Sequence, residues 1–226
     1  ETPYRGLAPF SASDYDYFFG RKRDATHIAA STITEALSVL FGPSGVGKSS
    51  VLGAALPRAL NGIIENTLFV PYFRWEQGFY RTLLARAQAR AQAPEGVEIA
   101  SLEALAEYWI EKHETPVVFV FDQFEQYFTG QDYGTGSGDK RFEADLARII
   151  QRRDLGAHVL ISIRADALSE LNRLRSCIPN ILTRCVALES LDSDAACEAI
   201  IGPLDQWRDE RRDGPVEADP DLVHEL

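Results

Sequence analysis

A glycine-rich loop between two regular segments sets the fold of this chain. It reads Gly42-Pro43-Ser44-Gly45-Val46-Gly47-Lys48-Ser49 and matches the pattern Gly-x4-Gly-Lys-Ser/Thr in full. The apolar residues 37–41 before it predict a strand, and the segment after it predicts a helix that Pro57 ends or kinks. A strand that turns into a helix through such a loop is typical of a P-loop, which is built on a parallel sheet covered by helices.

The residues of this loop have the chemistry needed to hold a triphosphate. Glycines adopt backbone conformations that other residues avoid, so successive N–H groups can point at phosphate oxygens, and the helix that follows adds its positive end. Lys48 supplies an ammonium group for the β and γ phosphates, and the Ser49 hydroxyl is placed to bind Mg²⁺. Ser50 belongs to the same cofactor-binding set, although its side chain is expected to face the adjoining structure. We expect ATP or ADP, with Mg²⁺, as the ligands.

A second motif follows the most apolar strand. Residues 117–121 read Val-Val-Phe-Val-Phe, so both faces of a central strand are expected to be buried. Asp122 ends this strand, which is expected to lie beside the P-loop strand, where a carboxylate can hold Mg²⁺. Glu125 is the candidate for polarising the attacking water, and a surface carboxylate is its alternative. Gln123 stands where many ATPases place that glutamate, which argues against fast hydrolysis.

The fourth predicted strand ends in a charged segment. Residues 159–163 are followed by Arg164-Ala165-Asp166, so Arg164 is expected at the same edge of the sheet as Asp122. A guanidinium there can bind the γ-phosphate in a bidentate manner, which makes Arg164 a catalytic candidate together with Lys48 and Glu125. An ion pair with Asp166 is the alternative role for this side chain.

Strands and helices alternate along the rest of the chain. The pattern predicts an α/β fold of three layers, with a five-stranded, mostly parallel sheet. The strands are expected at residues 37–41, 68–73, 117–121, 159–163 and, more weakly, 185–188. Helices are expected at residues 80–91, 102–112, 142–152 and 193–201, with Ser193 as the cap of the last one and a polar loop at residues 130–138.

The charge of the chain excludes some classes of partner. The 23 basic and 34 acidic residues give a formal net charge of −11, which repels a long nucleic-acid duplex and an anionic membrane surface. The longest apolar runs are strand-sized, far short of the roughly 20 residues that cross a bilayer. We therefore expect no direct binding of nucleic acid and no membrane partner.

The cysteines and the first residue bear on the setting of the chain. The three cysteines show no metal-binding spacing and cannot all pair, which favours a reducing compartment, the cytoplasm; they are Cys177, Cys185 and Cys197. The sequence starts at Glu1 and contains no methionine. It is expected to be a piece of a longer protein.

Taken together, these motifs resemble the STAND class of signalling ATPases, relatives of the AAA+ ATPases, and most closely its bacterial novel STAND group. The resemblance runs from about residue 3 to residue 203. It rests on the P-loop, which continues as Ser49-Ser50-Val51-Leu52, and on four further segments: Pro3-Tyr4-Arg5-Gly6-Leu7-Ala8-Pro9-Phe10, Phe18-Phe19-Gly20-Arg21, Asp122-Gln123-Phe124-Glu125 and Arg164-Ala165-Asp166.

The resemblance implies further contacts to the nucleotide. In this class the Phe-Gly-Arg segment lies near the adenine, so Phe19, Gly20 and Arg21 are expected beside the base or the phosphates. The family usually has an acid after that arginine, where this chain has Lys22. The segment Ile201-Gly202-Pro203 looks like one that touches the nucleotide in relatives, which makes Pro203 a candidate adenine contact; a helix stop is the alternative.

The resemblance also implies how the chain is organised and what it does. Residues 1–30 form an adenine-side segment, residues 31–190 the P-loop NTPase core, and residues 191–226 the start of a lid or linker. STAND proteins resemble switches in which ATP favours an assembled state, and which carry sensor and effector domains elsewhere. We expect a slowly hydrolysing ATPase module that self-associates in signalling or defence. The alternatives are an AAA+ remodelling motor, a P-loop small-molecule kinase and an interaction module that has lost catalysis.

Overall fold

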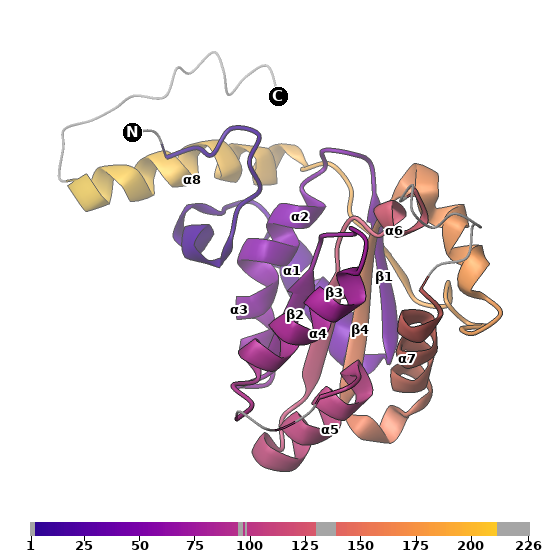
Figure 1. Cartoon of the computed structure of the whole chain (residues 1–226). Helices are drawn as coiled ribbons and strands as arrows, with labels where there is room; N and C mark the ends of the chain where they lie inside the picture. Colours follow the sequence, from indigo (N-terminus) through magenta and orange to yellow (C-terminus); the bar gives the residue numbers. More distant parts are fainter. Residues whose placement is uncertain (1–2, 95–96, 98, 130–138, 212–226) are drawn as a thin grey trace.

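Our computed structural model describes residues 3–94, 97, 99–129 and 139–211. Five parallel strands form a single sheet in the order β2-β3-β4-β1-β5 (Figure 1). They are β1 (Leu37–Gly42), β2 (Leu68–Tyr72), β3 (Val117–Phe121), β4 (Ala157–Arg164) and β5 (Cys185–Ala187). The predicted five-stranded α/β fold is therefore confirmed. The loop expected at residues 130–138 and the end of the expected lid, residues 212–226, lie outside the described residues.

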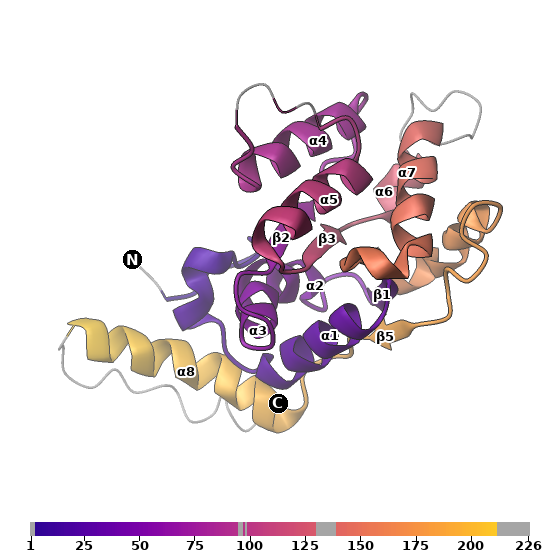
Figure 2. The ribbon, with the colours of Figure 1, turned by 90° about the horizontal axis from the view of Figure 1, so that it is seen from below.

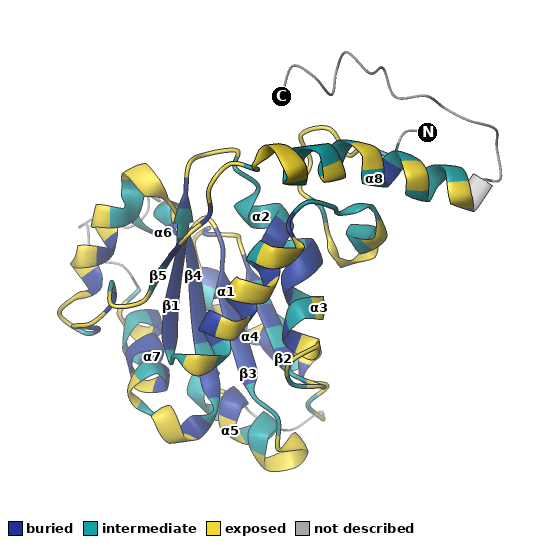
Figure 3. Ribbon diagram, turned by 180° about the vertical axis from the view of Figure 1, so that it is seen from behind, coloured by how far each residue is buried: buried dark blue, intermediate teal, exposed yellow. Residues whose placement is uncertain are grey.

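Helices cover both faces of the sheet, which gives three layers (Figure 2). One face carries α1 (Lys22–Thr34) and the P-loop helix, which consists of α2 (Lys48–Ser50), the π-helix η2 (Val51–Ala55) and α3 (Leu56–Asn61). The other face carries α4 (Phe79–Arg90), α5 (Leu102–His113) and α7 (Lys140–Gln151). Short elements connect these layers: η1 (Ala12–Tyr17), α6 (Glu125–Thr129), η3 (Arg153–Leu155) and η4 (Ala165–Leu174). Figure 3 shows the strands as the buried centre, with exposed outer faces on the helices.

The order of the strands corrects one expectation. The strand that ends at Asp122 does not lie beside the P-loop strand, because β4 pairs with both β1 and β3 and separates them. The middle of the sheet is therefore β4 and not β3. Residues 117–121 of β3 and 159–163 of β4 are all buried, as expected for strands with a neighbour on each side, so the apolar character of β3 did not decide which strand is the middle one.

Pro57 does not end the P-loop helix, which continues to Asn61. The turn before this proline is a π turn, in which the amide of Leu56 donates to the carbonyl of Val51. Proline has no N–H, and its ring crowds the preceding turn of a regular helix. The wider π turn accommodates this ring, so the helix changes its geometry instead of stopping.

The last helix, α8 (Ser193–Arg211), is longer than the predicted residues 193–201 and lies across one end of the layered body (Figure 1). Ser193 is not its cap. Asp192 takes that role, because its carboxylate accepts a hydrogen bond of 2.8 Å from the amide of Ala195. In the part of the chain that the structure describes, no helix has the length and apolar character to cross a membrane.

Pro203 lies inside α8 and is buried. The alternative that this proline stops the helix is therefore wrong. In the turn before it, the Tyr4 hydroxyl donates a hydrogen bond of 2.6 Å to the carbonyl of Ile200. A proline removes one backbone donor from a helix, and the N-terminal segment supplies a side-chain donor in the same turn.

A buried carboxylate joins the three helices of the second layer. Asp145 in α7 is 1% exposed and accepts hydrogen bonds from the Tyr80 hydroxyl of α4 and from the amides of Leu102 and Glu103 in α5. The two amides belong to the first turn of α5, where N–H groups have no partner within the helix. Burial and the bond to Asp145 raise the pKa of Tyr80, so its hydroxyl stays a donor.

Replacing Asp145 with alanine is expected to lower the free energy of unfolding by about 2 to 4 kcal/mol, because one hydroxyl and two amides lose a charged acceptor inside the protein. The matched control is Ser101→Ala, which removes the cap of the same helix and should cost about 1 kcal/mol. Urea denaturation followed by circular dichroism measures both losses. Equal losses for the two variants would contradict the role given to Asp145.

Candidate functional site

The glycine loop at the end of β1 is open where a phosphate would lie. Gly45 and Gly47 have positive φ angles of 79° and 99°, and a Cβ atom on either would meet no atom within 4 Å. Gly42 serves another purpose: a Cβ atom there would stand 2.4 Å from the carbonyl oxygen of Leu188. Two glycines thus face an open cradle of the kind in which backbone N–H groups bind anions, and Gly42 permits close packing of the loop against Leu188.

Lys48 lies at the base of this cradle. Its ammonium group donates to the carbonyl oxygens of Gly42 and Pro43, each at 2.8 Å. Burial lowers the pKa of Lys48, while the nearby carboxylates of Glu125 and Asp122 act in the opposite direction. The lysine therefore lies close enough to the ends of β3 and β4 for their charged side chains to influence its pKa.

Asp122 is held in place through its main chain as well as its side chain. The residue is 8% exposed; its amide donates to the Tyr72 carbonyl at 2.8 Å, and its carboxylate accepts from the Gln123 amide at 2.9 Å. The indole N–H of Trp75 donates to its carbonyl oxygen at 2.8 Å. Sequence analysis assigned no role to Trp75 in this site, because a tryptophan followed by polar residues carries no signal for a backbone hydrogen bond.

Glu125 reaches across to the neighbouring strand. It begins α6, and its carboxylate accepts a hydrogen bond of 3.3 Å from the backbone amide of Arg164. Gln123 is exposed, has a positive φ of 52°, and accepts a side-chain hydrogen bond from Gln126. The structure thus directs Glu125 toward the end of β4, while Gln123 is engaged with its own turn.

Arg164 stands directly beside the P-loop. The register of β1 and β4 pairs it with Gly42. Its guanidinium makes two hydrogen bonds to the carboxylate of Asp166, one of them at 3.0 Å, so the alternative ion pair is present. These bonds raise the pKa of Arg164. Both side chains are largely exposed, at 45% and 65%, and such a pair contributes little to stability; the sensing role of Arg164 stays a prediction.

Acidic and basic side chains gather near the cradle. The carboxylates of Asp122, Glu125 and Asp166 and the guanidinium of Arg164 all act electrostatically on Lys48. Within residues 3–94, 97, 99–129 and 139–211, no group of three His, Cys, Asp or Glu side chains is arranged to hold a metal alone. Mg²⁺ commonly relies on one or two protein oxygens together with substrate phosphates, and Ser49 with Asp122 fits that manner of binding.

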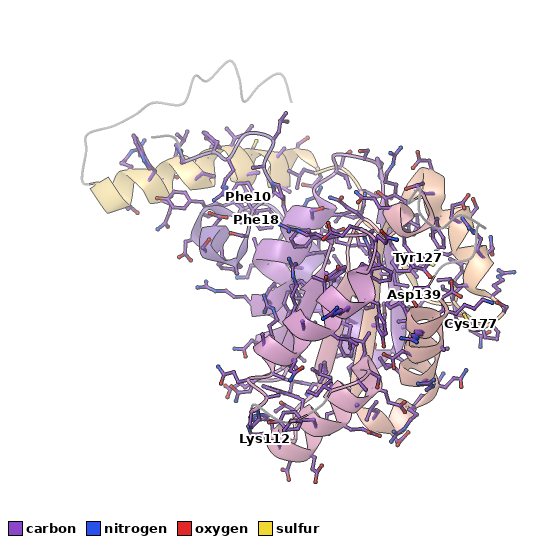
Figure 4. All side chains as sticks on the ribbon, viewed as in Figure 1. Phe10, Phe18, Lys112, Tyr127, Asp139 and Cys177 are labelled. Carbon is purple, nitrogen blue, oxygen red and sulfur yellow. The ribbon has the colours of Figure 1, made fainter. Side chains whose placement is uncertain are left out.

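The N-terminal segment packs against the start of the P-loop helix. The Ser50 hydroxyl accepts a hydrogen bond of 3.2 Å from the amide of Phe10, so it faces the adjoining structure as expected. The rings of Phe10 and Phe18 lie together below α8, with centroids 5.2 Å apart (Figure 4). A Cβ atom at Gly53, one turn further along the helix, would stand 2.6 Å from the Phe10 carbonyl.

Arg21 is a buried arginine that donates a hydrogen bond to the backbone of the P-loop. It is 8% exposed and donates to the carbonyl of Val46 at 2.9 Å and to the carboxylate of Asp24 at 2.7 Å. The family usually has an acid directly after this arginine. Here Lys22 stands at that position, and the acid that pairs with Arg21 is Asp24, one helical turn later. Sequence analysis missed Asp24, although an acid three residues after an arginine at a helix start is a recognisable pairing signal.

The two residues before Arg21 pack against α8. Gly20 has a φ of 78°, and a Cβ atom there would lie 2.3 Å from the carbonyl oxygen of Ala195. A Cβ atom at Gly202 would lie 2.4 Å from the ring of Phe19. The segment from Phe19 to Arg21 therefore connects the P-loop to α8, and glycines on both sides make that close contact possible.

A hollow of about 570 Å³ adjoins this segment, a volume suited to a small ligand. Gly20 and Arg21 line it, whereas Phe19 and Pro203 do not and are packed elsewhere. Its remaining walls come from two stretches, of which the sequence had named only Lys22. One is the start of α1, with Lys22, Arg23 and Asp24; the other runs from the end of β5 into α8, with Ala187, Glu189, Ser190, Leu191, Asp192, Asp194, Ala195 and Glu198. No sequence signal joins these two stretches, which only the fold brings together.

Comparisons with known proteins agree with this architecture. The sequence model of the family described as Novel STAND NTPase 1 matches residues 3–218, while a comparison with curated proteins gives no match. Similar solved structures include Cdc6p from Pyrobaculum aerophilum, with a TM-score of 0.56 and 14% identity over 90% of this chain and 52% of that chain. The ORC2 protein of Aeropyrum pernix is similar both in ADPNP-ADP complexes (TM-score 0.54, 14% identity, 92% and 54% covered) and in an ADP form (0.53, 14%, 92% and 55%). This chain spans about half the length of each, and such low identity shows the fold alone.

Replacing Arg21 with alanine is expected to lower the free energy of unfolding by about 1 to 3 kcal/mol, because the Val46 carbonyl and the Asp24 carboxylate each lose a charged donor. Arg23→Ala removes an exposed arginine two residues away and should change stability by less than about 0.5 kcal/mol. Urea unfolding of the two variants tests this difference. An Arg21→Ala protein as stable as Arg23→Ala would show that Arg21 does not support the loop.

Proposed function

Because this chain belongs to the novel STAND NTPase 1 family, we propose that it binds ATP with Mg²⁺ and acts as the nucleotide-dependent switch of a longer signalling or defence protein. One observation carries the proposal: the cradle at Gly45 and Gly47 is open, and Lys48 lies at its base within reach of the charges at the ends of β3 and β4. A loop that served only as a turn would not require this arrangement.

The residues of the site have separate tasks in binding. The amides of the P-loop and the start of α2 hold the phosphates. Lys48 exchanges its two carbonyl acceptors for phosphate oxygens, while Ser49 and Asp122 hold Mg²⁺, which offsets the charge of the phosphates and the surrounding acids. We assign the base to the hollow beside Gly20 and Arg21. The ADPNP and ADP named for the ORC2 structures are of the same ligand class.

We expect hydrolysis to be slow. Glu125 is the candidate for polarising water, but its carboxylate is engaged with the Arg164 amide. Gln123 cannot accept a proton as a carboxylate does. Arg164 would have to exchange Asp166 for the γ-phosphate, and the exposure of that pair makes the exchange feasible. A site of this kind favours a long-lived bound state over rapid turnover.

The contacts of the segment from Phe19 to Arg21 suggest how binding is transmitted. This segment touches the P-loop at one end and α8 at the other. We propose that residues 1–30 and 191–226 flank the core, residues 31–190, as a nucleotide-side segment and the start of a lid. Sensor and effector domains would lie elsewhere in the full-length protein, in the cytoplasm. A ligand shifts such an equilibrium only if it binds one conformation more tightly.

Lys48→Ala is expected to weaken binding of ATP with Mg²⁺ about tenfold to hundredfold, because charge-assisted hydrogen bonds to the phosphates are lost. Lys112→Ala is the matched control, since Lys112 lies at the end of the molecule far from α8 and the N-terminal segment (Figure 4). Isothermal titration calorimetry measures both affinities. Unchanged binding by the Lys48 variant would overturn the P-loop as the binding site.

The intact protein is expected to increase in mass at least twofold when ATP and Mg²⁺ replace ADP, because ATP is proposed to favour the assembled state. Multi-angle light scattering measures this change, and the Lys48→Ala protein should stay at its nucleotide-free mass. If the protein binds ATP but its mass does not depend on the nucleotide, the switch function is refuted and only a nucleotide-binding module remains.

A further inference from the structure

A buried hydroxyl near the candidate magnesium ligand makes no hydrogen bond within the part of the chain that the structure describes. Ser162 in β4 is 0% exposed, and its Oγ atom accepts and donates no hydrogen bond among the described residues. A second buried serine hydroxyl, that of Ser31 in α1, shares this property. Buried polar groups are almost always paired, so each of these two hydroxyls calls for an explanation.

The strand register places Ser162 at the nucleotide site. Val118 and Val120 of β3 share one core with Leu160 of β4, and they face the layer of α1 and α3. The register pairs Val120 with Leu160, and side chains alternate along a strand. The next positions on this face are therefore Asp122 and Ser162.

Two backbone contacts fix the surroundings of Ser162. Its carbonyl accepts a hydrogen bond of 2.9 Å from the amide of Phe124, two residues beyond Asp122. On the other side of β4, Ser162 pairs with Leu40 of β1, two residues before Arg164 pairs with Gly42. Ser162 thus lies between the end of β3 and the start of the P-loop, on the face that carries the P-loop helix.

We propose that Ser162 is a positioning residue of the magnesium site, whose hydroxyl donates to the Asp122 carboxylate when Mg²⁺ and a nucleoside triphosphate are bound. The inference rests on the proposed function. One carboxylate oxygen of Asp122 accepts a hydrogen bond from the Gln123 amide, and in the proposed bound form the Ser162 hydroxyl donates to the other oxygen. An unpartnered buried hydroxyl disfavours the free protein, so the same group stabilises the bound form relative to the free form.

The test measures stability, which should increase, and affinity for Mg²⁺, which should decrease. Ser162→Ala removes the unpartnered hydroxyl, so the thermal unfolding midpoint of the nucleotide-free protein should rise. The same change should raise the Mg²⁺ concentration that half-saturates ATP binding about tenfold, because a hydrogen bond to a charged ligand is lost. Affinity for ATP measured in EDTA should not change. Ser162→Cys, which has nearly the same shape and a weak donor, should show the same loss.

Ser31→Ala is the matched control. Ser31 lies toward the other end of β1, where its carbonyl accepts from the Ser38 hydroxyl. This variant should also raise the midpoint of the free protein, while its Mg²⁺ dependence stays that of the wild type. Unchanged Mg²⁺ dependence in Ser162→Ala, or an equal loss of ATP affinity in EDTA, would refute the inference. Absence of Mg²⁺-dependent ATP binding in the wild type would instead refute the proposed function.

Discussion

The two parallel ladders that β4 makes with β1 and β3 hold the candidate site together. They place Arg164 beside Gly42 and bring the end of β3, with Asp122, to the same edge of the sheet. None of these residues is close to another in the sequence. The ladders depend on the buried residues 159–163 of β4, and burial of their apolar side chains against both helical layers is the main stabilising contribution. The charged groups at the edge rely on this apolar support.

A second set of contacts links that edge to its surroundings. Trp75 lies at the centre of an aromatic cluster and donates to the Asp122 carbonyl, so packing of the second core layer is coupled to the position of a candidate metal ligand. On the opposite side, Arg21 couples the P-loop to the segment that contacts α8. The segment from Gly20 to Arg21 therefore lies in contact with both the P-loop and α8.

Errors of the sequence analysis share a physical cause. Ser193 and Asp192 are both good helix caps, and only the backbone geometry decides between them. The sequence left open whether Pro57 ends or kinks its helix, and a helix stop was the alternative role of Pro203; a π turn and a buried position within α8 accommodate the two prolines. Local preferences of about 1 to 3 kcal/mol are overridden when tertiary packing stabilises the helix on both sides of the residue.

The sequence by itself determined the glycine loop, the presence of a strand before it and the five-stranded α/β fold, because these features depend on local backbone chemistry and on hydrophobic periodicity. It placed the ends of β3 correctly and those of the other strands to within one or two residues. Only the tertiary structure decided that β4 lies between β1 and β3, that Asp24 pairs with Arg21, and that Ser162 is buried next to the position of Asp122 with no hydrogen bond from its hydroxyl to any described residue. These outcomes depend on which distant segments meet, and that is set by the packing of the whole core and not by any short pattern.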